Sequence, residues 1–187
     1  THMTESESRN AATSGAIAGL CPTTEANLGD GLFDLPTWLA DGGGLGIGSD
    51  SHISVSPVEE LRWLEYGQRL RDRGRNIAGD AGISTGSRLF DLAVSGGARA
   101  LGRAGPAGES GLSAGARADI VVLDADAAIF AGQSNETLLE SWIFSGNVPV
   151  VKDVFVGGKR VVADGRHPAE EEIAARYRKV LSELLGT

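Results

Sequence analysis

Asp50 and His52 are the residues whose types and spacing best suit chemistry. They follow a short apolar, glycine-containing segment, residues 45–49, that predicts a buried β-strand. A strand of a parallel sheet would carry Asp50 to its carboxyl end, where α/β folds place their functional sites. A carboxylate there can bind a metal ion or move a proton. An aspartate that only caps or turns the chain after a strand is the commoner use of this residue, so both interpretations stay open at this point.

His2 and His52 extend this candidate site. His2 precedes a predicted helix, because Thr4 and Glu7 have the spacing of a capping box. A histidine and a carboxylate at one edge of a sheet are the groups that metal-assisted hydrolysis requires, since one orients a water and the other transfers its proton. His52 and Asp50 would share a face if the chain were extended there. We expect the strand to end at about Asp50 and therefore assign His52 a supporting hydrogen-bonding role.

The elements that would position these residues alternate between strands and helices. The pattern predicts strands at 16–20 and 45–49, a short helix that begins at Thr4 or Glu5, and helices at 35–40, 57–75 and 84–98. This order is typical of a parallel α/β layout.

The character of the sequence changes after residue 101. Strands are predicted at 111–112, 118–124, 148–156 and 159–162, with Gly157 and Gly158 forming a two-residue hairpin turn, followed by an amphipathic helix at 168–185. We therefore expect an α/β part over residues 1–105 and a β-rich part with a terminal helix over residues 106–187.

Composition excludes several classes of function. The 187 residues carry a formal net charge of -8, which argues against a nucleic-acid-binding surface. No apolar run approaches the ~20 residues that cross a bilayer, and the polar first ten residues lack the apolar region of a signal peptide. The single Cys21 cannot form an internal disulfide and is expected to be a small buried hydrophobe. These features favour the cytoplasm and no membrane partner.

Two sets of segments resemble a known family. The segments ADIVVLD at 118–124 and DVFVGGKRV at 153–161, together with Asp50, resemble the metal-dependent amidohydrolase superfamily. The segment SDSH at 49–52, the block that continues to Arg71, and CPTTEANLGDG at 21–31 are similar to the formimidoylglutamate deiminases within it. The resemblance covers essentially the whole chain.

The resemblance implies a fold and a site. Members are TIM barrels with a small β-sandwich, so residues 1–105 would be the C-terminal part of the barrel, with strands 7 and 8 at 16–20 and 45–49, and residues 106–187 a sandwich portion with a terminal helix. Asp50 would bind one zinc ion and exchange a proton with the hydrolytic water. His2 would orient that water, and His52 would support the site.

The same resemblance implies an activity. The reaction would convert N-formimidoyl-L-glutamate and water to N-formyl-L-glutamate and ammonia, a step of histidine breakdown. The partners would be this small-molecule substrate and a second copy of the protein in a homodimer.

The sequence also departs from the family pattern. The His-x-His pair after strand 1, and the histidine with a nearby glutamate after strand 5, are absent, and a complete TIM barrel needs about 250 residues. We therefore expect this chain to be the C-terminal part of a longer enzyme, inactive alone. The alternatives are another deaminase of the superfamily, of the guanine or chlorotriazine type, and a non-catalytic binding or assembly module.

Overall fold

The computed structural model describes residues 1–104 and 111–186, which form two compact units. The first unit takes in the chain up to residue 113 and the segment 128–146, and the second takes in 114–127 and the chain from 147 onward. The expected boundary between residues 105 and 106 lies outside the described residues. Each unit contains two separate stretches of chain.

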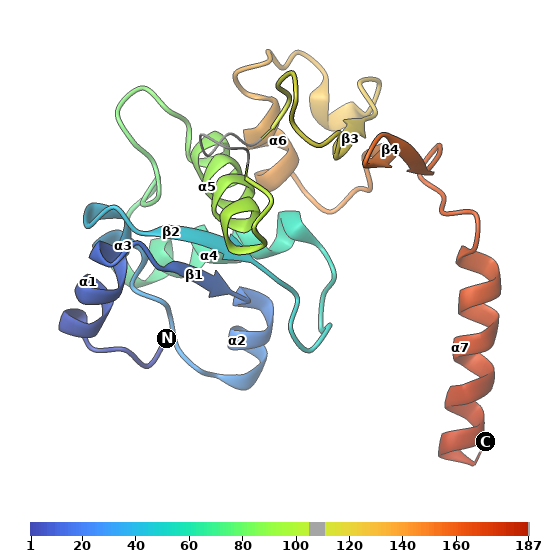
Figure 1. Ribbon diagram of the computed structural model, residues 1–187, viewed down its shortest axis with the longest axis horizontal. Coiled ribbons are helices and arrows are strands. Elements are labelled where there is room, and N and C mark those ends of the chain that lie inside the picture. The colour runs from blue at the N-terminus through green and yellow to red at the C-terminus, as the bar shows by residue number, and fades with distance from the viewer. Residues whose placement is uncertain (105–110, 187) are drawn as a thin grey trace. The chain divides into compact units, whose positions relative to one another are not determined.

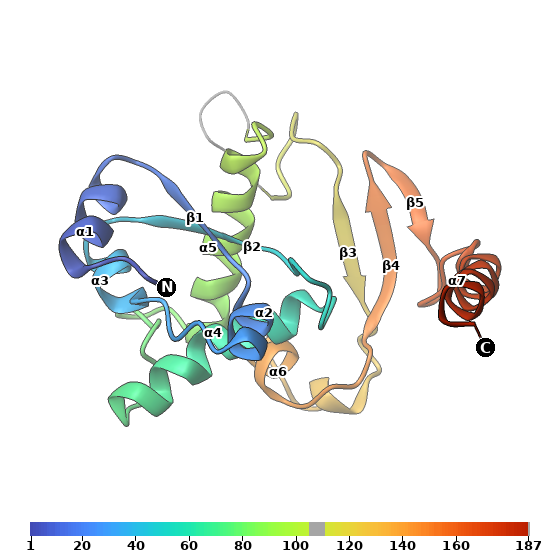
Figure 2. The same ribbon diagram turned by 90° about the horizontal axis from the view of Figure 1, so that it is seen from below.

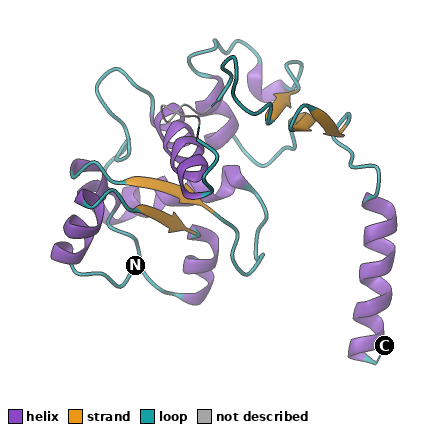
Figure 3. Ribbon diagram, in the orientation of Figure 1, coloured by secondary structure: helices purple, strands orange, loops and turns teal. Residues whose placement is uncertain are grey.

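The first unit combines two parallel strands with helices (Figures 1 and 3). Its elements in chain order are α1 (Glu5–Thr13), β1 (Ile17–Leu20), α2 (Pro22–Leu28), α3 (Leu35–Ala40), β2 (Gly44–Ile47), α4 (Pro57–Asp72), α5 (Thr85–Ala100), the 3-10 helix η1 (Ala128–Phe130) and α6 (Leu138–Phe144). β1 and β2 pair in parallel, with Ile17 opposite Gly44 and Leu20 opposite Ile47. Within the described residues, each of these strands has the other as its one strand neighbour.

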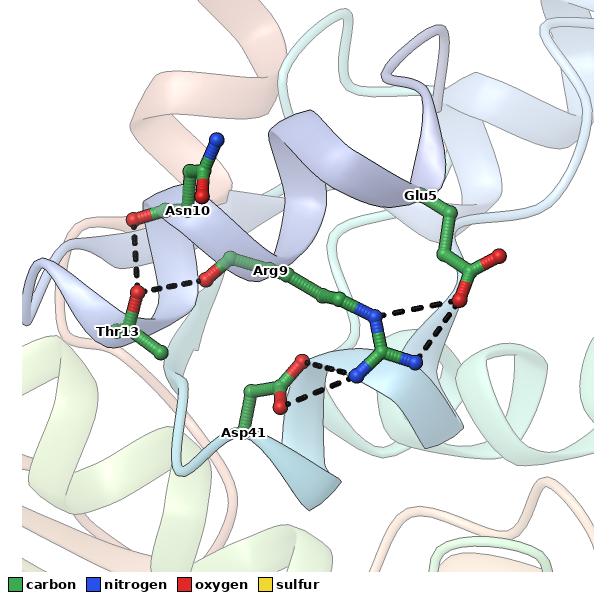
Figure 4. Close-up of polar contacts among 5 residues, drawn as sticks. All are labelled: Glu5, Arg9, Asn10, Thr13 and Asp41. Atoms are coloured by element: carbon green, nitrogen blue, oxygen red, sulfur yellow. Dashed lines mark hydrogen bonds and ion pairs between the residues drawn. The ribbon is translucent and has the colours of Figure 1, made fainter.

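Helix α1 begins at the predicted capping box. The Thr4 Oγ1 accepts a hydrogen bond from the Glu7 N–H, and the Glu7 carboxylate accepts one from the Thr4 N–H at 2.8 Å. Farther along α1, the Arg9 guanidinium donates to Glu5 at 2.8 Å and to Asp41, just after α3, at 3.3 Å (Figure 4). The prediction of this helix start is confirmed.

The core of the first unit is apolar and gathers side chains from nearly all of its elements. Its buried members are Ala12, Leu20, Phe33, Leu35, Trp38, Leu45, Leu61, Leu64, Ala78, Leu89 and Ile143. Helix α5 crosses β2 at very short range, because a Cβ placed on Gly96 would lie 1.9 Å from the Leu45 carbonyl oxygen. Glycine at this position therefore allows the helix and strand to touch.

A buried carboxylate ties α4 to the loop that follows it. Glu65 is fully buried, and its oxygens accept hydrogen bonds from the N–H groups of Ile77 at 3.0 Å and Ala78 at 2.9 Å. The Arg69 guanidinium donates to the same carboxylate at 2.7 Å. A buried charge with three donors is stable where an unpaired one would not be.

The second unit is an antiparallel sheet followed by a helix (Figure 2). Its elements are β3 (Ile120–Leu123), β4 (Val151–Val156), β5 (Lys159–Val162) and α7 (Glu170–Leu185), and the strand order is β3-β4-β5. Gly157 and Gly158 join β4 to β5 with φ values of +57° and +80°, the left-handed conformation that a two-residue hairpin turn requires. The predicted hairpin is confirmed.

The second unit buries little side-chain surface. Of its described residues, Val150 is the one that is buried, at 3% exposed. Val121 on β3 and Val156 on β4 are 50% and 44% exposed, and α7 has no buried residue among those described. The predicted apolar stripe of α7 therefore exists but is open to solvent.

Sequence patterns located most elements but missed two. The mixture of parallel strands and helices is confirmed, whereas α2 and α6 fall in segments where no helix was predicted. The strand-like pair Gly111 and Leu112 forms a bend instead. None of the helices in the described part of the chain is both long and apolar enough to cross a membrane.

Candidate functional site

The two parallel strands of the first unit bring their carboxyl ends to one edge. β1 is followed directly by Cys21, and β2 is followed by Gly48, Ser49 and Asp50. The Gly48 N–H donates to the Leu20 carbonyl at 2.9 Å, which continues the pairing one residue past the strand. The segments after both strands therefore lie side by side, as the prediction of a site at this edge requires.

Asp50 lies in a tight turn rather than at the tip of an extended strand. β2 ends at Ile47, and the His52 N–H donates to the Ser49 carbonyl at 2.9 Å to close the turn. Asp50 and His52 have φ values of +44° and +57°, in the left-handed region that few non-glycine residues adopt. The expectation that the strand ends at about Asp50 is wrong, because backbone pairing stops earlier and the chain reverses.

The Asp50 side chain is available for chemistry. The residue is exposed, and its carboxylate has no hydrogen-bond or ion-pair partner among the described residues. A turn aspartate with a structural purpose would accept hydrogen bonds from nearby N–H groups. The Asp50 carboxylate therefore does not form the turn through a hydrogen bond to a described residue.

Cys21 lies next to this turn and stays protonated. Its pKa is raised by burial and by the negative charges of Asp50, Glu25 and Glu60, against a smaller opposing effect of the Gly48 N–H. A thiol with a raised pKa is a poor nucleophile. Cys21 thus has a packing role, as expected, although it is half-buried rather than fully buried.

The two histidines are not joined to Asp50. His2 is exposed, and its Nε2 lies 3.9 Å from the Asp30 carboxylate, with no contact to Asp50. The exposed His52 contributes its backbone N–H to the turn, while its side chain makes no hydrogen bond to a described residue. The catalytic role of His2 and the side-chain role of His52 remain predictions.

Thr24 and Glu60 connect the segments around Asp50 and were missed by the sequence analysis. Thr24, on α2, contacts the backbone of the Asp50 turn, and Glu60, on α4, holds the first turn of α2. The sequence did contain a signal, because Pro22 directly after a strand is also the preferred first residue of a helix. Interpreting Pro22 as the first residue of a helix would have placed Thr24 on α2.

The donor set does not amount to a metal site. Among residues 1–104 and 111–186, no group of three His, Cys, Asp or Glu side chains is placed to hold a metal ion. Asp50 could supply one oxygen ligand, whereas a zinc site generally has three or four protein ligands. What the described residues offer is one exposed carboxylate that can accept and return a proton.

Comparisons with known proteins agree on the family. The model of the amidohydrolase family matches residues 1–161. A formimidoylglutamate deiminase from Pseudomonas aeruginosa is 53% identical over 99% of this chain and 40% of its own length. The crystal structure of an amidohydrolase from Brucella melitensis superposes with a TM-score of 0.91 at 46% identity, over 99% of this chain and 40% of that one.

A more distant structure shares the fold. An adenosine deaminase from Xanthomonas campestris, solved with bound zinc, matches with a TM-score of 0.80 at 21% identity, over the whole of this chain and 42% of that one. The chain thus spans about 40% of the length of the proteins that it matches.

Proposed function

Because the chain belongs to the amidohydrolase family, we propose that its protein hydrolyses N-formimidoyl-L-glutamate to N-formyl-L-glutamate and ammonia. The observation that carries this proposal is the 53% identity to a formimidoylglutamate deiminase over 99% of the chain. The two more distant functional classes, guanine and chlorotriazine hydrolases, become alternatives for the assay to exclude.

The proposed fold follows from the same relationship. β1 and β2 would be strands 7 and 8 of a TIM barrel over residues 1–105, and residues 106–187 would form part of a β-sandwich and a terminal helix. The TM-score of 0.91 against an amidohydrolase supports this assignment. The position of Asp50 after β2 supports it too, since barrel active sites lie at the carboxyl ends of strands.

The chemistry needs a proton carrier at the reacting carbon. A water oxygen bonds to the formimidoyl carbon, the C–N bond to the terminal nitrogen breaks, and ammonia leaves, so that a formyl group remains. In this proposal the Asp50 carboxylate passes both protons of the attacking water, one after the other, to the departing nitrogen, so that the water oxygen remains as the formyl C=O. His2 would orient the water, and His52 would support the Asp50 turn.

Zinc is the proposed cofactor, with Asp50 as one ligand. The zinc found in the Xanthomonas campestris structure supports this choice. The described residues do not complete a zinc site, so the other ligands would come from the part of the relatives' length that this chain does not span. Metal analysis of the full-length protein, expected to give about one zinc per protomer, checks this point.

The test is ammonia release from N-formimidoyl-L-glutamate by the full-length protein. Asp50→Asn should reduce kcat by at least about 100-fold, because the amide cannot take up the proton. Asp91→Asn is the matched control, since Asp91 is an exposed aspartate of α5 with no side-chain contact to a described residue. It should leave kcat unchanged.

Other outcomes would support the alternatives. Turnover of guanine or a chlorotriazine without turnover of N-formimidoyl-L-glutamate would indicate another deaminase of the family. A full-length protein that contains no zinc, or an Asp50→Asn variant that loses no activity, would indicate a binding or assembly module. We also propose a cytoplasmic homodimer, for which light scattering of the full-length protein should give twice the protomer mass.

A further inference from the structure

Thr24 contacts the backbone on both sides of Asp50. Its Oγ1 donates a hydrogen bond to the Ser49 carbonyl at 3.1 Å and accepts bonds from the Ser51 N–H at 3.4 Å and the Ser51 hydroxyl at 3.2 Å. A hydroxyl has one donor and two acceptor lone pairs, so these contacts use its full capacity. Thr24 is 1% exposed, and solvent therefore does not compete for these bonds.

The turn needs such a support because its backbone is strained. Asp50 has a φ of +44°, and a non-glycine residue keeps this conformation only where its surroundings hold it. The His52 N–H closes the turn from within the same segment. Thr24 is the contact that fixes both flanking peptide groups from a separate element.

Helix α2, which carries Thr24, is itself firmly attached to the core. The Glu60 carboxylate accepts the Thr23 N–H at 2.9 Å and the Thr23 hydroxyl at 2.5 Å. Glu60 is 2% exposed and belongs to α4, whose Leu61 and Leu64 lie in the core. The Thr24 hydroxyl is thus held at a fixed place relative to the core.

We propose that Thr24 is a positioning residue that sets the direction of the Asp50 carboxylate. It acts through the Ser49 and Ser51 peptide groups and does not touch the substrate. The inference rests on the proposed function, since it assigns Asp50 to proton transfer. A carboxylate displaced by about 1 Å can lose about 100-fold in rate, so a single buried hydroxyl can control turnover.

The test replaces the hydroxyl by a methyl group in the full-length protein. Thr24→Val keeps the side-chain shape but leaves the Ser49 carbonyl and Ser51 N–H without their partner. We expect kcat to fall about 10- to 100-fold with KM near its wild-type value, because the change affects an oriented group rather than substrate binding. Thr24→Ser, which restores the hydroxyl, should recover most of kcat.

Thr85→Val is the matched control. It makes the same exchange at a similarly buried threonine, on α5, whose hydroxyl has no hydrogen-bond partner among the described residues. It should leave kcat close to wild type. An equal loss in Thr85→Val and Thr24→Val, or no loss in Thr24→Val, would overturn the proposal.

Amide hydrogen exchange tests the same contact without turnover. In Thr24→Val, residues 49–52 should exchange faster while α4 and α5 keep their protection. Unchanged exchange at 49–52, or a loss spread over the whole unit, would contradict a positioning role. If the wild-type protein releases no ammonia, the proposed function fails, and this experiment still decides whether Thr24 holds the turn.

A second variant covers the case in which Thr24→Val does not fold. Thr24→Ala leaves space in which a water can bridge the Ser49 and Ser51 groups. It should fold and show a smaller loss of kcat than the valine variant would. Wild-type kcat together with wild-type exchange at 49–52 in Thr24→Ala would overturn the proposal.

Discussion

The two units of this chain form regular structure for different reasons. In the first unit, strands and helices surround a core that includes Trp38, Leu45 and Leu89. In the second unit the strands are just as regular, yet Val150 is the one buried residue among those described. The hairpin glycines and the backbone ladder define the second sheet, whereas burial defines the first. Regular secondary structure is therefore no measure of how much a region stabilises itself.

The largest difference between the units is expected when one apolar strand side chain is shortened in each of them. Leu45→Ala in β2 should cost about 2–5 kcal/mol, because Leu45 is fully buried and leaves a cavity. Val121→Ala in β3 should change stability by less than about 0.5 kcal/mol, because Val121 is half exposed. Denaturant unfolding followed by hydrogen exchange, which resolves the two units, measures both. Equal effects would show that the second unit has a hidden core.

A smaller effect should come from adjacent glycines of α5. Gly96→Ala should cost about 1–3 kcal/mol, since the new methyl would overlap the Leu45 carbonyl. Gly97→Ala should instead stabilise α5 by about 0.5–1 kcal/mol, because nothing lies within 4 Å of its Cβ position. The comparison of their melting temperatures tests whether contact with β2, rather than helix propensity, decides the outcome.

The second unit should be most sensitive at its turn. Gly158→Ala places a side chain at φ +80° and should cost about 1 kcal/mol, more than the loss of the exposed Val121 side chain. Hydrogen exchange of β4 and β5 gives the measurement. If Gly158→Ala leaves the hydrogen exchange of β4 and β5 unchanged and Val121→Ala accelerates it, then side-chain packing rather than turn geometry stabilises this sheet.

The smallest expected effect concerns the start of α7. Arg166 holds the pKa of Glu170 below its ordinary value of 4.5 through a side-chain hydrogen bond of 2.5 Å. A lowered pKa in the folded state stabilises the helix start above pH 4.5, and this contribution is lost as the pH falls through the lowered value. The first turn of α7 should therefore exchange faster at pH 3 than at pH 6, after correction for intrinsic rates. Arg166→Gln should reduce the difference, while the His167 N–H bond to Glu170 keeps part of it.

Much of the fold could be predicted because its signals are local. The Thr4 capping box, the Gly157 and Gly158 turn and the apolar strands all act within a few residues. Helix α2 was missed because a proline after a strand can lead into either a loop or a helix. The helix that follows Pro22 is held by Glu60, which is far along the chain.

The candidate site could be predicted only in part. Asp50 was found because it follows an apolar strand, but its left-handed turn contacts Thr24, which is distant in sequence. The separation of His2 from Asp50, and its approach to Asp30, likewise depend on tertiary structure. Residue types thus indicate which chemistry is available, and long-range contacts determine where the side chains lie.

The two-stranded parallel sheet has a consequence for handling the molecule. Because β1 and β2 pair with each other alone among the described strands, the outer edge of each has no strand partner there. Such edges are templates for strand addition between chains. Refolding of this chain by itself should therefore give yields that fall as protein concentration rises, with aggregates that gain β-structure.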